Sequence, residues 1–173
     1  MTLVFVHGWA FDPGFWDPLL AELDGLPTAA IDLGFRRSGP RIPELQGPLV
    51  AIGHSLGFLW LLHERPFVWT KLIAVNGFPR FVEGDGFTPA VPVSTVERMI
   101  AGMDRDPGAV VGDFLALCGG GEPPDDLNPG RLRDGLHWLL RWDGRAAMDE
   151  EKVQALAGIR QAMMHEAETR PGS

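Results

Sequence analysis

Short apolar runs and helically spaced apolar residues alternate in the first half of the chain. Four apolar runs have the length and continuity of strands buried on both faces: residues 3–6, 28–32, 49–52 and 72–75. Apolar residues recur at helical spacing after the first and third runs, in residues 15–23 and 56–62. Strands that alternate with helices are typical of βαβ units. The pattern therefore predicts an α/β fold with a mainly parallel sheet covered by helices on both faces.

The pattern changes after Asn76, where helical spacing continues without intervening strands. Ser94 and Glu97 fit a capping box, which predicts a helix that ends near Met103. A second helix is predicted from Pro107, and a third is predicted with Asn128 as its N-cap. Three consecutive helices indicate a helical cap inserted over the sheet.

The last residues of the chain allow two interpretations. The spacing of Val153, Leu156 and Met163 suits an amphipathic terminal helix. The family resemblance described below implies instead that residues 155–165 lead into a further core strand. Periodicity favours the helix. We therefore expect three parts, listed in chain order: a core with residues 1–77, a cap with residues 78–145, and residues 146–173 as the start of a C-terminal core half or a terminal helix.

Length and charge restrict the class of protein further. The chain has 173 residues, which suits one globular unit, and 15 Lys and Arg against 23 Asp and Glu give a net charge of −8. That charge disfavours a nucleic-acid partner. Cys118 is the single cysteine, so we expect neither a disulfide framework nor a cysteine metal site, and no cofactor. Without a signal-peptide pattern or a membrane-length apolar run, we expect a cytoplasmic monomer.

Residues Gly53 to Gly57 read Gly-His-Ser-Leu-Gly and fit the pattern Gly-x-Ser-x-Gly. Between a strand and a helix, this pattern makes a sharp turn that projects the serine oxygen, and the glycines avoid collisions of Cβ atoms. Ser55 is therefore the candidate nucleophile. The alternative is a glycine-rich turn with an incidental serine.

His7, Gly8 and Trp9 follow the first predicted strand and reach the same sheet edge as Ser55. Acyl transfer through a serine needs two backbone N–H donors for the tetrahedral oxyanion. The amides of Trp9 and Leu56 are predicted to supply them. The Trp9 ring is alternatively a core aromatic, and both roles are compatible.

These motifs resemble the α/β-hydrolase superfamily and, within it, the pimeloyl-acyl-carrier-protein methyl ester esterases of biotin synthesis. The resemblance extends to residues 32–38, where Arg36 or Arg37 replaces a family glycine, and to residues 73–76. It implies a serine carboxylic-ester hydrolase that cleaves a methyl ester of a pimeloyl-acyl-carrier-protein-like substrate. Carried over by residue, it implies the following substrate-binding set: Trp9, Ser55, Leu56, Phe114, Leu115, Ala116, Leu117 and Cys118.

The resemblance also implies an acidic carrier protein that binds to arginines of the cap. Five arginines fall in the predicted cap: Arg98, Arg105, Arg131, Arg133 and Arg141. The alternative is a set of solvated helix faces.

A serine nucleophile needs a general base and an acid that orients it, and in this fold the chain order is serine, then Asp or Glu, then histidine. By this order, His165 is a poor base. His63 and His137 fall on helices away from the predicted site, and Asp143 is interpreted as a turn residue. His165 and Glu168 fall nearest to the base and acid positions.

In the family register, the histidine would lie beyond Ser173, so we expect the last core strands to be missing from this chain. The second hypothesis is therefore a hydrolase-like protein without a triad base, which is inactive or acts as a binding module.

Overall fold

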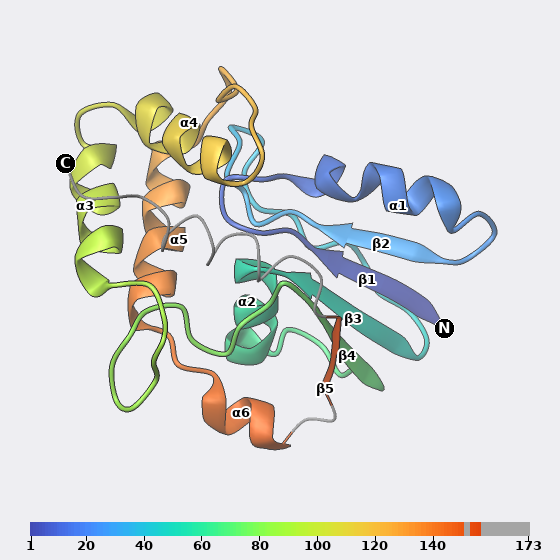
Figure 1. The fold of residues 1–173 in the computed structure, drawn as a ribbon. Helices are drawn as coiled ribbons and strands as arrows, with labels where there is room; N and C mark the ends of the chain where they lie inside the picture. Colours follow the sequence, from blue (N-terminus) through green and yellow to red (C-terminus); the bar gives the residue numbers. More distant parts are fainter. Residues whose placement is uncertain (151–152, 157–173) are drawn as a thin grey trace.

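The computed structural model of the chain describes residues 1–150 and 153–156 (Figure 1). Within these residues, a five-stranded parallel sheet has the order β2-β1-β3-β4-β5. Its strands are β1 (Thr2–Val6), β2 (Thr28–Ile31), β3 (Leu49–His54), β4 (Lys71–Val75) and β5 (Val153–Leu156). The predicted α/β fold and the first four predicted strands are confirmed.

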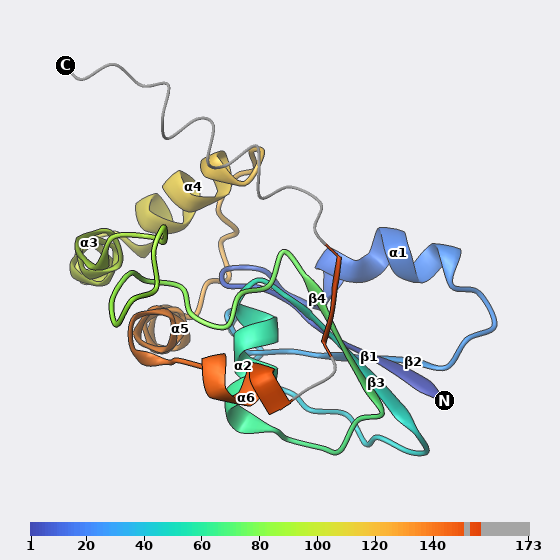
Figure 2. The ribbon, with the colours of Figure 1, turned by 60° about the horizontal axis from the view of Figure 1, so that its bottom comes forward.

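Alternate side chains of the strands build a separate core on each face of the sheet. Val4 and Val6 of β1 pack in the larger core, whereas Phe5 packs with Trp16 in the smaller one. A short 3₁₀ helix and α1 lie over the smaller core, and α2 and α6 lie over the opposite face (Figure 2). These helices span Pro13–Trp16, Asp17–Glu22, Leu56–Glu64 and Arg145–Glu150, respectively.

Three helices lie beyond the end toward which the strand arrows point (Figure 1). They are α3 (Val93–Met103), α4 (Pro107–Leu117) and α5 (Pro129–Arg141), and we call residues 93–141 the helical segment. The predicted N-cap at Asn128 is confirmed, because its side chain accepts a hydrogen bond from the amide of Arg131 at 3.2 Å. Asp106 caps α4 in the same way.

The predicted capping box at Ser94 and Glu97 is wrong. Helix α3 begins at Val93, and Pro92 occupies the N-cap position without a side-chain hydrogen bond. The Pro92 carbonyl accepts the amide of Thr95 at 3.0 Å. Since the proline ring presets its own backbone angle, the helix starts before the serine. Ser94 therefore lies inside the first turn.

The helix predicted across Val153 and Leu156 is also wrong, because these residues form β5. They pair in parallel with Leu72 and Val75 at the outer edge of β4. Unpaired backbone N–H and C=O groups at the edge of β4 form hydrogen bonds with residues 153–156. A pattern of side chains within one segment contains no information about such distant partners. His165 and Glu168 lie outside the described residues.

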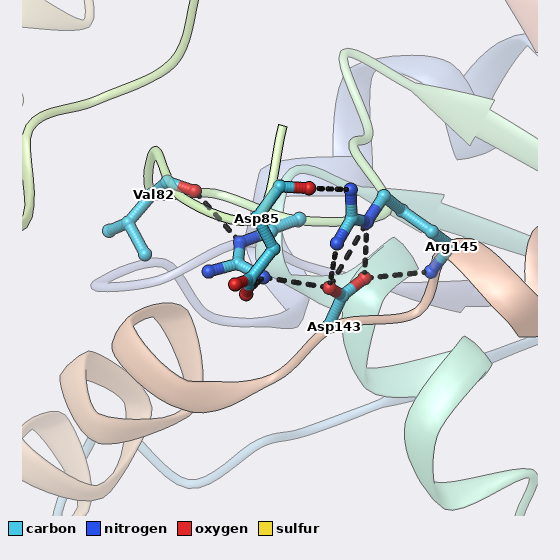
Figure 3. Close-up of polar contacts among 5 residues, drawn as sticks. Val82, Asp85, Asp143 and Arg145 are labelled. Carbon is cyan, nitrogen blue, oxygen red and sulfur yellow. Dashed lines mark hydrogen bonds and ion pairs between the residues drawn. The ribbon is translucent and has the colours of Figure 1, made fainter. Parts of the chain in front are cut away.

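An ionic cluster joins the chain that leads into the helical segment to the chain that follows it (Figure 3). Asp143 accepts hydrogen bonds from Arg80 Nη1 at 2.8 Å and from Arg145 Nη2 at 2.7 Å. Arg80 Nη1 also donates to Asp85 at 2.8 Å. The amide of Gly144 donates to the Pro79 carbonyl at 2.7 Å, which brings the outgoing and returning chains together. Asp143 is therefore the centre of this junction rather than a simple turn residue.

We expect Asp143→Asn to lower the free energy of unfolding by ~1–2 kcal/mol, because the substitution removes charge-assisted hydrogen bonds. Hydrogen bonds from Arg145 and Arg80 hold the pKa of Asp143 well below its ordinary value. The difference in the free energy of unfolding between wild type and variant should therefore be fully present at pH values above the ordinary pKa of an aspartate. It should shrink as pH falls below that value toward the depressed pKa of Asp143. Urea unfolding at a series of pH values measures it.

Asp134→Asn is the matched control, since Asp134 is exposed and lies 3.7 Å from Arg131 in a surface pair. Asp134→Asn should lower the free energy of unfolding by no more than about 0.5 kcal/mol. Equal costs for the two variants would show that the junction adds no stability.

Candidate active site

Ser55 occupies a strained backbone conformation at the junction of β3 and α2. Its φ of 52° and ψ of −119° fall in a region that side-chain-bearing residues rarely adopt. Such a conformation costs on the order of 1–3 kcal/mol and persists only where the surrounding structure enforces it. The strain marks Ser55 as a residue that the fold holds in a fixed position.

The two flanking glycines allow this junction because neighbouring backbone atoms fill the space where a Cβ would lie. A Cβ on Gly53 would come within 2.4 Å of Phe58 Cα, and one on Gly57 within 2.3 Å of the Val6 carbonyl oxygen. Because the blocking atoms belong to the backbone, no side-chain movement relieves the collision. Helix α2 therefore starts directly against the end of β1.

The loop after β1 lies beside Ser55. A Cβ on Gly8 would come within 3.1 Å of Ser55 Cβ and within 2.9 Å of His54 Nδ1. Leu56 is the first residue of α2, so its amide has no acceptor within the helix. In the part of the chain that the structure describes, no backbone group accepts a hydrogen bond from the amides of Trp9 or Leu56. These are the two amides that the sequence predicts as oxyanion donors.

The Trp9 side chain lies between this loop and the helical segment. It is 1% exposed, its indole N–H donates to the Leu132 carbonyl at 2.8 Å, and its ring meets Phe114 edge-on at 4.9 Å. Gly135 of α5 approaches so closely that a Cβ there would lie 2.7 Å from Trp9 Cδ1. The ring is therefore a core aromatic, as one prediction held, while its backbone belongs to the loop beside Ser55.

His7 is fully buried and has partners at both ring nitrogens. Nε2 lies 3.0 Å from the amide nitrogen of Leu33 and 3.4 Å from Asp32 Oδ1, and Nδ1 lies 2.9 Å from the Gly8 carbonyl oxygen. Burial alone would raise the pKa of Asp32, but the hydrogen bond from the Gly34 amide and the charge of Arg36 lower it. No separate role for His7 is predicted from the sequence. A histidine directly after a buried apolar strand was the available signal.

His54 packs in the core behind Ser55. Its ring stacks on Phe15, with centroids 4.2 Å apart, and its buried Nδ1 has no hydrogen-bond partner among the described residues. Burial lowers the pKa of His54 to about 4. The imidazole is therefore neutral near pH 7.

The other described histidines lie away from Ser55. His63 is exposed at the end of α2 and stacks on Trp142 at 3.9 Å, and His137 is half-buried on α5. Among the described residues, no histidine forms a hydrogen bond with Ser55 Oγ. The sequence-predicted base and acid, His165 and Glu168, fall outside these residues.

The predicted substrate-binding segment of α4 divides by exposure. Phe114 contacts Trp9, and Leu115 is buried in the larger core. Ala116, Leu117 and Cys118 are exposed. Although Cys118 is exposed as a residue, partial burial raises the pKa of its thiol, so no environment that activates it is present. Phe114 is the member of this segment that lies beside the Trp9 loop.

Within residues 1–150 and 153–156, no three His, Cys, Asp or Glu side chains gather closely enough to hold a metal ion. None of the helices described has both the length and the apolar character that a membrane crossing requires.

A strand–Ser55–helix junction on a parallel sheet, with a helical segment beyond the strand ends, defines an α/β-hydrolase. Solved structures agree in fold. An esterase from Exiguobacterium antarcticum has a TM-score of 0.72 at 15% identity over 90% of this chain and 71% of its own. A thermophilic esterase from Thermogutta terrifontis has a TM-score of 0.65 at 16% identity over 99% and 78%, respectively.

Curated relatives define the family. The pimeloyl-[acyl-carrier protein] methyl ester esterase of Xanthomonas oryzae pv. oryzae (strain MAFF 311018) is 30% identical over 86% of this chain and 71% of its own length. The enzyme of the same name from Stenotrophomonas maltophilia (strain K279a) is 33% identical over 66% of this chain. The chain belongs to the pimeloyl-[acyl-carrier protein] methyl ester esterase family.

The match has a limited extent. The chain aligns with 51% of the length of the Stenotrophomonas relative, about half. No family model matches the chain.

We expect the neutral, buried His54 to make stability depend on pH. Its pKa of about 4 lies below the ordinary histidine value, so the unfolded chain binds a proton that the folded chain rejects. The contribution of the neutral imidazole to the free energy of unfolding should be fully present above about pH 6.5. It should decline as pH falls toward 4. Urea unfolding of wild type and His54→Phe, which keeps a stacking ring, measures the effect.

The free energy of unfolding of His54→Phe should fall less than that of wild type across this interval. His63→Phe is the matched control, because His63 is exposed, and it should follow the wild-type curve. Parallel curves for wild type and His54→Phe would contradict the burial of a neutral imidazole.

Proposed function

We propose that this chain is a serine carboxylic-ester hydrolase. The observation that carries the proposal is the strained backbone of Ser55 between two glycines whose Cβ positions are blocked. Ser55 Oγ attacks the ester carbonyl, and the amides of Trp9 and Leu56 donate to the oxyanion that forms. One such donor contributes roughly 3 kcal/mol of transition-state stabilisation.

The reaction also needs a group that accepts the Ser55 proton and returns it to the leaving alcohol. Our candidates for the base and the orienting acid are His165 and Glu168, which both follow Ser55 in the chain. Their order is the reverse of the usual order in this fold, in which the acid precedes the histidine. Water then attacks the carbonyl of the acyl group on Ser55, and the base takes the proton of the water. The bond to Ser55 Oγ breaks, the base returns the proton to Ser55, and the carboxylic acid leaves.

For the substrate, we propose a methyl ester at the end of an acyl chain carried by an acyl-carrier protein. The support is the activity for which the family relatives are named, together with the apolar contact between Phe114 and the Trp9 ring, whose backbone belongs to the loop beside Ser55. An acyl chain needs an apolar surface of this kind next to the oxyanion donors. Trp9, Leu56 and Phe114 are therefore the proposed substrate contacts.

The proposed carrier surface uses only part of the arginine set. Arg131 donates to the Leu33 carbonyl at 2.7 Å, and Arg133 pairs with Asp104, so both are engaged within the chain. Arg98, Arg105 and Arg141 are exposed, and the hydrogen bonds of Arg98 to Ser94 and Thr95 stay within its own helix. We therefore assign carrier contact to these three residues.

A second function is favoured by one observation. No histidine among the described residues forms a hydrogen bond with Ser55 Oγ, so the nucleophile is positioned there without a base. A protein with this arrangement binds an ester without turning it over. The two functions differ in one measurable quantity, the rate of ester hydrolysis.

We expect wild type to hydrolyse short p-nitrophenyl esters and Ser55→Ala to lose at least about a thousandfold in kcat/KM, because the nucleophile is removed. Release of p-nitrophenolate, followed at constant protein concentration, measures both. Ser38→Ala is the matched control, since Ser38 is an exposed serine on the loop after β2.

Hydrolysis that survives Ser55→Ala would contradict the assigned nucleophile. An inactive wild type that still binds an ester analogue would establish the second function instead.

We expect charge reversal at Arg98, Arg105 and Arg141 together to raise KM for a carrier-bound ester about tenfold, because steering by an acidic partner weakens. The KM for a p-nitrophenyl ester should stay unchanged. Steady-state kinetics on both substrates separates the effects, and Arg41→Glu, an exposed arginine outside the helical segment, is the control. Equal loss on both substrates would contradict a carrier surface.

A further inference from the structure

We propose that His7 is a positioning residue that sets the direction of the Trp9 oxyanion donor. This inference rests on the proposed function, because it assigns a role in the same site. It starts from a covalent fact: the Gly8 carbonyl and the Trp9 amide belong to one planar peptide group. Any interaction that fixes the carbonyl also fixes the N–H.

The His7 ring holds this peptide group from one side. Its Nδ1 lies 2.9 Å from the Gly8 carbonyl oxygen in a fully buried contact. The Gly8–Trp9 bond is trans, so the Trp9 N–H points away from the carbonyl that His7 holds. The contact therefore fixes the plane in which the oxyanion donor lies.

The Leu33 amide determines which ring nitrogen carries the proton. It lies 3.0 Å from His7 Nε2 and can only donate, so Nε2 supplies the lone pair. In a neutral ring the proton then resides on Nδ1, which donates to the Gly8 carbonyl. Asp32 Oδ1, at 3.4 Å from the same Nε2, is the more distant neighbour.

The Leu33 amide belongs to the peptide group of the Asp32 carbonyl, which accepts a hydrogen bond from the amide of Arg41 at 2.9 Å. The helical segment and the Asp32 side chain hold the next peptide group. Arg131 Nε of α5 donates to the Leu33 carbonyl at 2.7 Å, and the Asp32 side chain accepts the Gly34 amide at 2.7 Å. A continuous series of contacts thus runs from α5 through Leu33 and His7 to the peptide beside Ser55.

The other end of Trp9 is held independently. Its indole N–H donates to the Leu132 carbonyl, so the side chain is fixed by α5 while the peptide group is fixed by His7. Ala10, the next residue, has a φ of 65°, so the chain turns sharply immediately after the donor. His7 is therefore the contact that acts on the peptide plane itself.

This arrangement acts on the transition state rather than on substrate binding. The oxyanion exists only after attack on the carbonyl, so a misdirected Trp9 N–H lowers kcat and leaves KM largely unchanged. If His7 had a purely structural role, its substitution would lower the free energy of unfolding and change both kcat and KM. The effect would then be the same whichever ring nitrogen the substitution removed.

Two substitutions of His7 separate its two nitrogens. The side-chain amide of His7→Asn reaches the position of Nδ1 and keeps a donor for the Gly8 carbonyl. The amide of His7→Gln reaches the position of Nε2 and keeps an acceptor for the Leu33 amide. Each variant retains one hydrogen bond of the ring and loses the other.

We expect His7→Gln to lower kcat for a p-nitrophenyl ester by about ten- to a hundredfold with KM within about twofold, because the oxyanion donor loses its orientation. His7→Asn should keep kcat within about fivefold of wild type, on the same reasoning. Urea unfolding of both variants shows whether either difference follows stability. Equal kcat values for the two variants, or a larger loss in His7→Asn, would overturn the proposal.

A second measurement does not depend on activity. Nitrogen-15 NMR of the His7 ring at neutral pH should show a protonated Nδ1 and an unprotonated Nε2, and the proton on Nε2 would overturn the proposal. Wild type that fails to hydrolyse any ester while His7 has the expected tautomer would contradict the proposed function alone. Hydrolysis that depends on Ser55 but is equal in both His7 variants would contradict this inference alone.

Discussion

The close approach of helix α2 to strand β1 is the constraint on which the site depends. A Cβ on Gly57 would lie only 2.3 Å from the Val6 carbonyl oxygen, so only glycine allows the helix to begin there. This approach forces the chain from β3 to turn within one residue, and Ser55 takes the strained backbone. It also brings Gly8 beside Ser55, so Ser55 and the Trp9 loop share one edge of the sheet. The backbone contact and the candidate chemistry are parts of a single arrangement.

The helical segment completes this arrangement from the other side. Gly135 lets α5 approach Trp9, and the indole and Arg131 then bond across the interface to Leu132 and Leu33. The junction at Asp143 closes the same segment where it leaves and rejoins the core. Since buried polar contacts require defined geometry, they restrict the segment to one placement over the strand ends.

Local patterns predicted the elements whose signals lie within a few residues. The first four strands, the Asn128 cap and the strand–Ser55–helix junction each follow from neighbouring side chains and glycines. The features that sequence reasoning missed depend on contacts between distant segments. Residues 153–156 join the sheet because β4 offers a free edge, and Arg131 is engaged because Leu33 lies across the interface. His7 belongs to the same class, since its role requires Leu33 and Gly8 together.

We propose above all that the fold holds Ser55 as an activated nucleophile. A fluorophosphonate probe forms a covalent bond only with an activated serine, so incubation of the native protein with this probe, followed by peptide mass mapping, shows whether Ser55 is activated. We expect one adduct on Ser55 that is lost when the protein is unfolded before incubation. An unlabelled native protein, or an adduct at another serine, would mean that Ser55 is not the activated nucleophile.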